Sequence, residues 1–295
     1  MSTERRHPDT AELDAWPLAR SLEALVAGHE GGVAAVRRAL PDLTRAAEGI
    51  EPRLARGGRL GYAGAGTSGR LAVLDAAELA PTFGFDRTVV LLAGGAAAIR
   101  RSMEGAEDDE DAARGEVDEA GLGEADVLIG VAASGATPYT RAAMRRAREL
   151  GAFTVGLANA PGAPLLREAE VGVLLDSGPE VLAGSTRMAA GTAQKAALNA
   201  LSTAVLVRLG GAYGNLMVGM RPLNAKLRRR AVTIVREATG VDDEAAAAAL
   251  AVCDQRIRDA IVTLLADVEP AEARRRLAAA GERVRDAIAG GATTE

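Results

Sequence analysis

Five short, continuously apolar segments alternate with stretches of helical character over the first two thirds of the chain. They are residues 59–63, 88–93, 126–132, 153–158 and 171–175. Strands of this kind are buried on both faces, as in a parallel sheet that helices cover on each side. The 295 residues suffice for one such domain with helical additions. The pattern therefore predicts an α/β fold built on a doubly wound, five-stranded parallel sheet.

Helical patterns lie on either side of this alternating region. Residues 13–58 have apolar positions at helical spacing, and everything from about residue 186 onward reads as helical. Asp242 is a suitable N-cap for one C-terminal helix, and Pro270 fits the first turn of the last one. No internal repeat is evident. We expect an N-terminal helical segment (1–52), a sheet domain (53–213) and a C-terminal helical domain (214–295).

The composition narrows the possible functions. A net charge of -5 argues against nucleic acid or an anionic membrane as partner. No apolar run approaches the roughly 18 residues of a membrane span, and the first ten residues lack the apolar core of a secretion signal. Cys253 is the only cysteine, so no internal disulfide is expected. These features predict a cytoplasmic protein.

Histidine is too scarce for two common kinds of catalytic site. His7 and His29 are the only histidines, and both lie in the N-terminal stretch. A zinc site or a Ser-His-Asp triad would have almost nothing to be built from. Carboxylates are the remaining acid and base candidates.

A glycine-rich loop follows the first predicted strand, where residues 64–69 read Gly-Ala-Gly-Thr-Ser-Gly. Ligands of open parallel sheets bind beyond the carboxyl ends of the strands. Glycine lets the backbone approach an anion, and the start of the next helix supplies unpaired N–H groups. The glycine spacing alone would also fit a dinucleotide-binding loop or a plain tight turn. The hydroxyls favour a sugar or phosphate ligand, with Gly66, Thr67 and Ser68 as candidate binding residues.

Two further loops with hydroxyl side chains follow the third and fifth predicted strands. Their hydroxyls suit phosphate oxygens but would also serve as helix caps, and an arginine in the second loop has the fork geometry that binds oxyanions. One of the chain's only two lysines follows shortly afterwards. Three such loops at strand ends indicate a convergent phosphosugar site, with these additional candidates: Ser134, Gly135, Thr137, Ser185, Thr186, Arg187 and Lys195.

Three glutamates near these loops are candidates for acid–base chemistry. Glu78 lies late in the helix that follows the glycine loop, and Glu104 and Glu107 lie in an acidic stretch after the second strand. A solvated surface role is the alternative for each, because glutamate is usually exposed.

Residues 64–83, GAGTSGRLAVLDAAELAPTF, resemble the signature of the N-acetylmuramic acid 6-phosphate etherases, which have the sugar isomerase (SIS) fold. The similarity runs over nearly the whole chain, from Thr3-Glu4 to the C-terminal helices. Other segments resemble the family's further motifs in the same order: EGAED (104–108), AASGATPY (132–139), GPEVLAGSTRM (178–188), AGTAQK (190–195), YGNLMV (213–218) and NAKL (224–227).

The resemblance implies a cofactor-independent lyase acting on a phosphorylated amino sugar. By resemblance, Glu107 removes the C2 proton of the ring-opened sugar, and Glu78 protonates the departing lactate oxygen. Two glutamates in different environments can hold opposite protonation states at one pH. Glu104 is the rival of Glu107 for the role of base. The resemblance also implies a homodimer, without indicating which subunit supplies which glutamate.

Four residues depart from the family pattern and bear on substrate range and rate. They are Ala136 and Ala189, where Arg and Lys are usual, and Gly219 and Leu223, where Asp and a hydroxyl residue are usual. Two other functions stay open. One is a non-catalytic regulator that senses sugar phosphates, and the other is an aldose–ketose isomerase of the same fold. Retention of both Glu78 and Glu107 favours the lyase, because a sensor needs no acid–base pair.

Overall fold

The computed structural model describes residues 5–290 and divides them into two compact units. The first, here the sheet unit, comprises the described residues up to Ala76 together with Arg87–Ser202. The second, the helical unit, comprises Ala77–Asp86 and the described residues from Thr203 onward. Thr3 and Glu4, where the family resemblance begins, lie outside the described residues. The three-domain division at residues 52 and 213 stays a prediction.

The sheet unit contains the predicted five-stranded parallel sheet. Its strands pair in the order β2-β1-β3-β4-β5, and every pairing is parallel. The first, third and fourth strands are buried along their whole length, as continuously apolar strands should be. The bounds are β1 (Leu60–Gly64), β2 (Thr88–Leu92), β3 (Val127–Val131), β4 (Phe153–Ala158) and β5 (Val171–Leu174).

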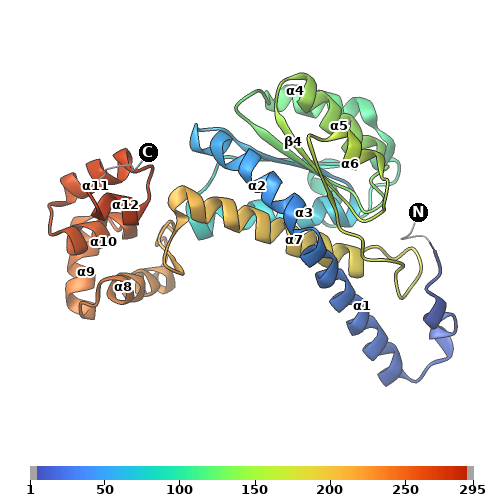
Figure 1. The fold of residues 1–295 in the computed structure, drawn as a ribbon, viewed down its shortest axis with the longest axis horizontal. Coiled ribbons are helices and arrows are strands. Elements are labelled where there is room, and N and C mark those ends of the chain that lie inside the picture. Colours follow the sequence, from blue (N-terminus) through green and yellow to red (C-terminus); the bar gives the residue numbers. More distant parts are fainter. Residues whose placement is uncertain (1–4, 291–295) are drawn as a thin grey trace. The chain divides into compact units, whose positions relative to one another are not determined.

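Helices cover both faces of this sheet, which confirms the doubly wound arrangement (Figure 1). One face carries α4 (Glu110–Ala120), α5 (Pro138–Glu149) and α6 (Pro164–Glu168). The other carries α2 (Leu40–Ala55) and the sheet-unit parts of α3 (Gly66–Phe83) and α7 (Ala189–Leu206). Two short 3₁₀ turns, η4 (Gly95–Ile99) and η5 (Ala106–Asp108), connect β2 to α4.

The N-terminal helical prediction is confirmed for most of its length. Two 3₁₀ turns, η2 (Pro8–Thr10) and η3 (Leu13–Ala15), lead into the long helix α1 (Leu18–Arg38), and α2 follows it. None of the described helices is both long and apolar enough to span a bilayer.

The part of the helical unit that begins at Thr203 is not entirely helical, contrary to the prediction. A π-helical turn, η6 (Val207–Gly211), ends α7 and leads into a two-stranded hairpin of β6 (Ala212–Tyr213) and β7 (Leu216–Met217). Gly214 in the connecting turn has φ +59°, a backbone region that glycine enters without strain. A two-residue strand is too short for its alternating pattern to be seen in the sequence.

Five helices complete this unit: α8 (Ala225–Thr239), α9 (Asp243–Val252), α10 (Ile257–Ala266), α11 (Pro270–Ala279) and α12 (Val284–Ile288). Asp242 caps α9 as predicted, because its carboxylate accepts a hydrogen bond of 2.8 Å from the Ala245 N–H. Pro270 does begin a helix, but α12 follows it, so α11 is not the last.

The expectation of no internal repeat was wrong. Residues 250–261 and 277–288 carry Leu, Ala, Arg, Arg, Asp, Ala and Ile at matched positions. Both stretches run from the end of one helix, through a turn, into the next. The turns close alike: Gln255 N–H donates to Leu250 O, and Glu282 N–H donates to Leu277 O, each at 2.8 Å. The α9–α10 and α11–α12 pairs are therefore two copies of one helix–turn–helix element.

Candidate phosphosugar site

The sheet topology places two of the three predicted loops next to each other. β1 and β3 are hydrogen-bonded neighbours, with Gly64 in register with Val131 at their carboxyl ends. From β1 the chain proceeds to β2 at one edge, and from β3 it proceeds to β4 and β5 at the other. The β1–β3 boundary is therefore the switch point, outside which parallel α/β sheets bind their ligands. The glycine loop and the loop that begins at Ala132 both start there.

The glycine loop has the geometry of an anion cradle. Gly66 is exposed with φ +54°, and a Cβ built there would meet no atom within 4 Å. Gly69 is packed tightly instead, because its Cβ would lie 2.7 Å from Gly64 O and 2.4 Å from Leu92 Cδ1. The loop is thus closed against the sheet at Gly69 and open to solvent at Gly66.

The N-terminus of α3 supplies the donors of this cradle. The Gly69 N–H donates to Ala65 O at 3.1 Å. The N–H groups of Gly66, Thr67 and Ser68 come earlier and have no helical carbonyl one turn before them. Such donors, with the positive end of the helix dipole, favour a phosphate. Thr67 is half-buried, and Ser68 is buried.

The second loop uses one of its hydroxyls internally. Ser134 Oγ accepts a hydrogen bond of 3.1 Å from the Ala136 N–H, and Gly135 O accepts one of 3.0 Å from the Leu165 N–H. Thr137 is the N-cap of α5, but its side chain makes no capping hydrogen bond. Ser134 therefore shapes the turn, whereas the Thr137 hydroxyl is not used as a cap. A ligand contact for either residue stays a prediction.

The third loop approaches the first through Gly191 of α7. The Gly191 N–H donates to Thr186 O at 2.9 Å, and a Cβ built on Gly191 would lie 3.6 Å from Thr67 Cγ2. Ser185 and Thr186 are half-buried, and Arg187 is exposed. Lys195 is exposed one helical turn after Gly191, on the same side of α7. The structure thus brings Thr67 and Thr186 to one place.

A buried carboxylate already occupies the N-terminus of α7. Glu180 is 1 % exposed, and its two oxygens accept hydrogen bonds of 2.9 Å from the Ala189 and Ala190 N–H groups. A ligand at the third loop would therefore use side chains and not this helix end. The helices after the first two loops, α3 and α5, by contrast have no described side chain as a cap.

A second buried carboxylate joins α3 to β1 and α7. Asp75 is 3 % exposed and accepts hydrogen bonds from the Tyr62 hydroxyl (2.8 Å), Asn199 Nδ2 (2.6 Å) and Ser202 Oγ (3.1 Å). Burial raises the pKa of Tyr62 well above its ordinary value, and the Asp75 charge adds to the effect. The phenol therefore stays protonated as a donor. This cluster fixes the helix that carries the glycine-loop N–H groups.

The predicted catalytic glutamates lie on different elements. Glu78 is exposed on α3, one turn beyond Asp75, and Glu107 is exposed in the 3₁₀ turn η5. This turn packs against α5, the helix that Thr137 begins. Glu104 is also exposed, two residues before η5, so exposure does not distinguish the two rival bases. Their roles stay predictions.

Sequence reasoning missed Glu180 and Asp75 as organisers of the site. Both lay inside motifs that were noticed, but Glu180 binds the backbone of a helix that begins nine residues later, and Asp75 binds side chains more than 120 residues away. A buried acid has no periodic signal of its own, so only the fold could reveal these contacts. Within residues 5–290 no group of three or more His, Cys, Asp or Glu side chains could hold a metal ion.

The fold and the strand-end loops define a sugar-phosphate domain of the SIS class. Residues 112–204 match the SIS domain model, and residues 23–148 match the model of the N-terminal SIS domain of glucokinase regulatory protein. A phosphosugar isomerase of Bacteroides fragilis, described as putative and involved in capsule formation, has a similar fold. Its TM-score is 0.52 at 21% identity, covering 68% of this chain and 95% of that one.

Two curated relatives match almost from end to end. The N-acetylmuramic acid 6-phosphate etherase of Deinococcus radiodurans is 54% identical over 95% of this chain and 92% of its own. The enzyme of the same name from Rubrobacter xylanophilus is 51% identical over 95% of this chain and 93% of its own. The chain belongs to the N-acetylmuramic acid 6-phosphate etherase family.

Proposed function

We propose that this protein is a carbon–oxygen lyase that cleaves the lactyl ether of N-acetylmuramic acid 6-phosphate. A base takes the C2 proton of the open-chain aldehyde, and the resulting enolate expels the C3 oxygen, which leaves as D-lactate after protonation. Water then adds across the C2–C3 double bond to give N-acetylglucosamine 6-phosphate. Neither step requires an oxidant, a metal ion or an organic cofactor.

One observation carries this proposal above all. More than half of the residues are identical to those of a curated etherase along nearly the full length of both chains. Glu78 and Glu107 are both present in the segments that resemble the etherase motifs. The open anion cradle at the start of α3 supports recognition of the substrate phosphate, with Thr67, Thr137, Thr186 and Lys195 as further contacts.

Release of lactate tests the proposal. Purified protein incubated with N-acetylmuramic acid 6-phosphate should release D-lactate and N-acetylglucosamine 6-phosphate in equal amounts. A sensor would bind the substrate without releasing lactate, and an aldose–ketose isomerase would rearrange a sugar phosphate while the ether stayed intact. Folded protein that binds the substrate but releases no lactate would contradict the proposed lyase.

We also propose that the protein forms a homodimer through α1. Leu18, Leu22, Val26 and Val33 on this helix are exposed, with exposed fractions of 75, 54, 58 and 46%. The first three are each four residues apart, so they lie along one side of the helix. An apolar stripe of this kind favours a protein partner over water, and a second copy of the chain would bury it symmetrically.

A cytoplasmic location is the setting that fits this activity. The one cysteine, Cys253, is a buried free thiol. Its pKa is raised by burial, which keeps the thiol protonated and unreactive. A fluorescent fusion observed with a periplasmic and a cytoplasmic marker would test the location.

A further inference from the structure

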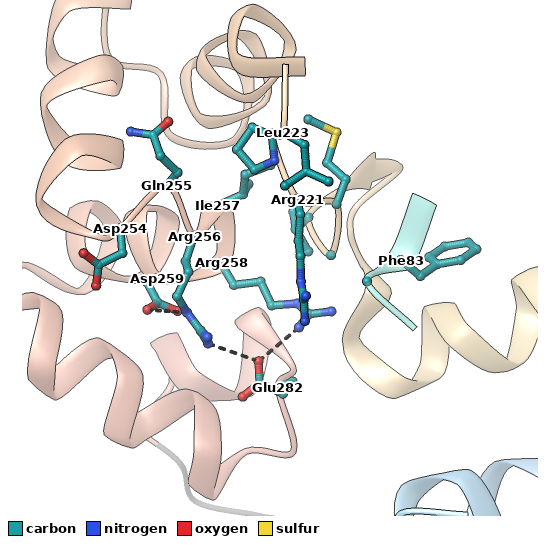
Figure 2. Close-up of a pocket in the computed structure, with 15 residues that line it drawn as sticks. Phe83, Arg221, Leu223, Asp254, Gln255, Arg256, Ile257, Arg258, Asp259 and Glu282 are labelled. Carbon is teal, nitrogen blue, oxygen red and sulfur yellow. Dashed lines mark hydrogen bonds and ion pairs between the residues drawn. The ribbon is translucent and has the colours of Figure 1, made fainter. Parts of the chain in front are cut away.

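The helical unit contains a cavity of its own, of about 600 Å³, which the proposed reaction does not use. It lies beside the first copy of the helix–turn–helix repeat, and all of its lining residues belong to the helical unit. Figure 2 shows the three guanidinium groups that line it, together with the acidic residues of the same wall. A volume of this size is in the range of small-molecule sites.

Arg221 gives this cavity a cation that no protein group neutralises. The other two lining arginines are paired: Arg258 with Glu282 at 3.0 Å, and Arg256 with Asp259 at 2.8 Å. The Arg221 side chain is exposed, and its guanidinium makes no hydrogen bond or ion pair with another described residue. An unpaired guanidinium in a lined cavity is suited to an oxyanion, which it can bind with two parallel hydrogen bonds.

Arg258 adds a second guanidinium that is held firmly in the wall. Its Nε donates to Gly210 O at 3.0 Å, and its Nη1 donates to Glu282 at 3.0 Å. Burial lowers its pKa, and the Glu282 charge opposes this effect. Gly219 leaves room for this guanidinium in its present position, because a Cβ there would lie 2.8 Å from Arg258 Nη2 and 2.3 Å from Phe83 O.

Asp259 contributes a second polar atom that lacks a hydrogen-bond partner among the described residues, its carboxylate oxygen Oδ1. It lines the cavity and is completely buried. One carboxylate oxygen receives the guanidinium groups of Arg256 and Arg274 at 2.8 and 2.9 Å. The other oxygen, Oδ1, has no donor among the described residues. Buried acceptors in folded proteins nearly always have a donor, so a ligand hydroxyl or a water is expected there.

The second copy of the repeat shows that the turn alone does not require this arrangement. There Asp286, the counterpart of Asp259, pairs with Arg283 at the protein surface, where the two side chains are 38% and 44% exposed. The cavity copy alone combines a completely buried carboxylate with a nearby unpaired arginine. The difference points to a ligand at the first copy.

We propose that this cavity is a second ligand site, which takes a small phosphorylated sugar or polyol. Its phosphate binds Arg221 beside Arg258, and a hydroxyl donates toward Asp259. All of the cavity's lining residues belong to the helical unit, whereas the strand-end loops belong to the sheet unit. It would allow the protein to respond to a sugar phosphate other than the one being converted.

The single cysteine gives a reporter next to the wall of this cavity. Cys253 directly precedes Asp254 and Gln255, two residues of the cavity wall. In full-length protein labelled with ¹⁵N-cysteine, one amide signal reports on this turn. A ¹⁵N-lysine sample gives the signals of Lys195 and Lys226, of which the Lys195 signal reports on the sheet-unit loops. Each sample is titrated with inorganic phosphate and with glucose 6-phosphate, and with sodium chloride at equal ionic strength.

The Cys253 signal should move in a saturable manner with both phosphates but not with chloride. Arg221→Ala should raise the apparent dissociation constant at Cys253 by about tenfold or more, because one charge-assisted contact is lost. Arg229→Ala is the matched control, since Arg229 is an exposed arginine on α8 outside the cavity wall, and it should leave the curve unchanged. Both arginines are exposed, so neither change removes a core contact.

Two results would overturn the proposal. One is a Cys253 signal that does not respond to phosphate, and the other is an identical titration curve in Arg221→Ala and wild type. Movement of the Lys195 signal alone would assign all phosphate binding to the sheet unit and would also refute the second site. Lactate release is a separate measurement, so a failure here leaves the proposed lyase function untouched.

Discussion

At the scale of single residues, the proposed chemistry asks two exposed glutamates for opposite tasks. One must begin as a carboxylate to take a proton from carbon, and the other must begin as an acid to give a proton to the lactate oxygen. The roles can be separated experimentally, because the two proton transfers act on different atoms.

Replacement of Glu78 should stop the reaction after its first step. Glu78→Gln should reduce lactate release by about 100-fold or more, since general acid catalysis contributes at least this factor. Exchange of the C2 hydrogen with deuterium from heavy water should continue, because that step precedes departure of lactate. The exchange is measured by NMR, with Glu119→Gln as a control at an exposed glutamate on α4. Loss of exchange together with lactate release would contradict the acid role.

The rival bases Glu104 and Glu107 call for a paired comparison. Glu107→Gln should lower both C2 exchange and lactate release by about 100-fold or more. Glu104→Gln should keep both near the wild-type rates. If Glu104→Gln loses both activities and Glu107→Gln keeps them, Glu104 is the base, and the assignment by motif position is wrong.

At the scale of elements, Asp126 fastens the start of β3 to β1. Its carboxylate accepts hydrogen bonds from the Arg59 N–H (2.8 Å), the Arg59 guanidinium (2.7 Å) and the Gly123 N–H (3.0 Å). Burial raises the pKa of Asp126, but the hydrogen bonds from Arg59 and Gly123 outweigh it, so the net pKa lies below the ordinary value. A carboxylate whose pKa is lowered by folding stabilises the protein above its unfolded-state pKa.

Asp126→Asn should therefore destabilise the protein at neutral pH but not in acid. The loss at pH 7 should be about 1 to 2 kcal/mol, toward the lower end for a charged hydrogen bond because Arg59 is one-third exposed. The difference from wild type should shrink as the pH falls below about 4, where the wild-type carboxylate also becomes protonated. Urea unfolding at several pH values measures it, with Asp111→Asn as an exposed control. A difference that is constant with pH would contradict the charge argument.

The sequence allowed the repeated strands and loops to be predicted better than the contacts between them. Strands buried on both faces are recognisable as continuous runs of apolar residues. These runs predicted the sheet, and the loops that follow them, with Gly66 and Ser134, were found at their ends. The β6–β7 hairpin and the helix–turn–helix repeat were missed. A two-residue strand has no visible period, and the repeat is preserved at seven of twelve positions, mostly in the helices that flank its turn. The Glu180 cap and the Asp75 cluster depend on how the chain folds around a buried acid, which no local pattern encodes.

At the scale of the whole molecule, the α1 stripe should determine the oligomeric state. Leu22→Asp combined with Val26→Asp should convert the proposed dimer into a monomer, because association would bury two uncompensated charges in each subunit. Light scattering coupled to size-exclusion chromatography measures the mass. Val252→Asp, an equally drastic change at an exposed apolar residue of α9, should leave the dimer intact. A dimer that persists in the double variant would place the interface elsewhere.

The division of the chain also has a consequence for the order of events during synthesis. Residues 77–86 leave the ribosome early, yet they belong to a unit whose remainder begins only at Thr203. Translation of the intervening stretch takes on the order of ten seconds at typical bacterial rates. During that interval residues 77–86, which include Glu78, have been synthesised, but the rest of the helical unit has not. The sheet unit can therefore assemble on the nascent chain, whereas the helical unit can be completed only near chain termination.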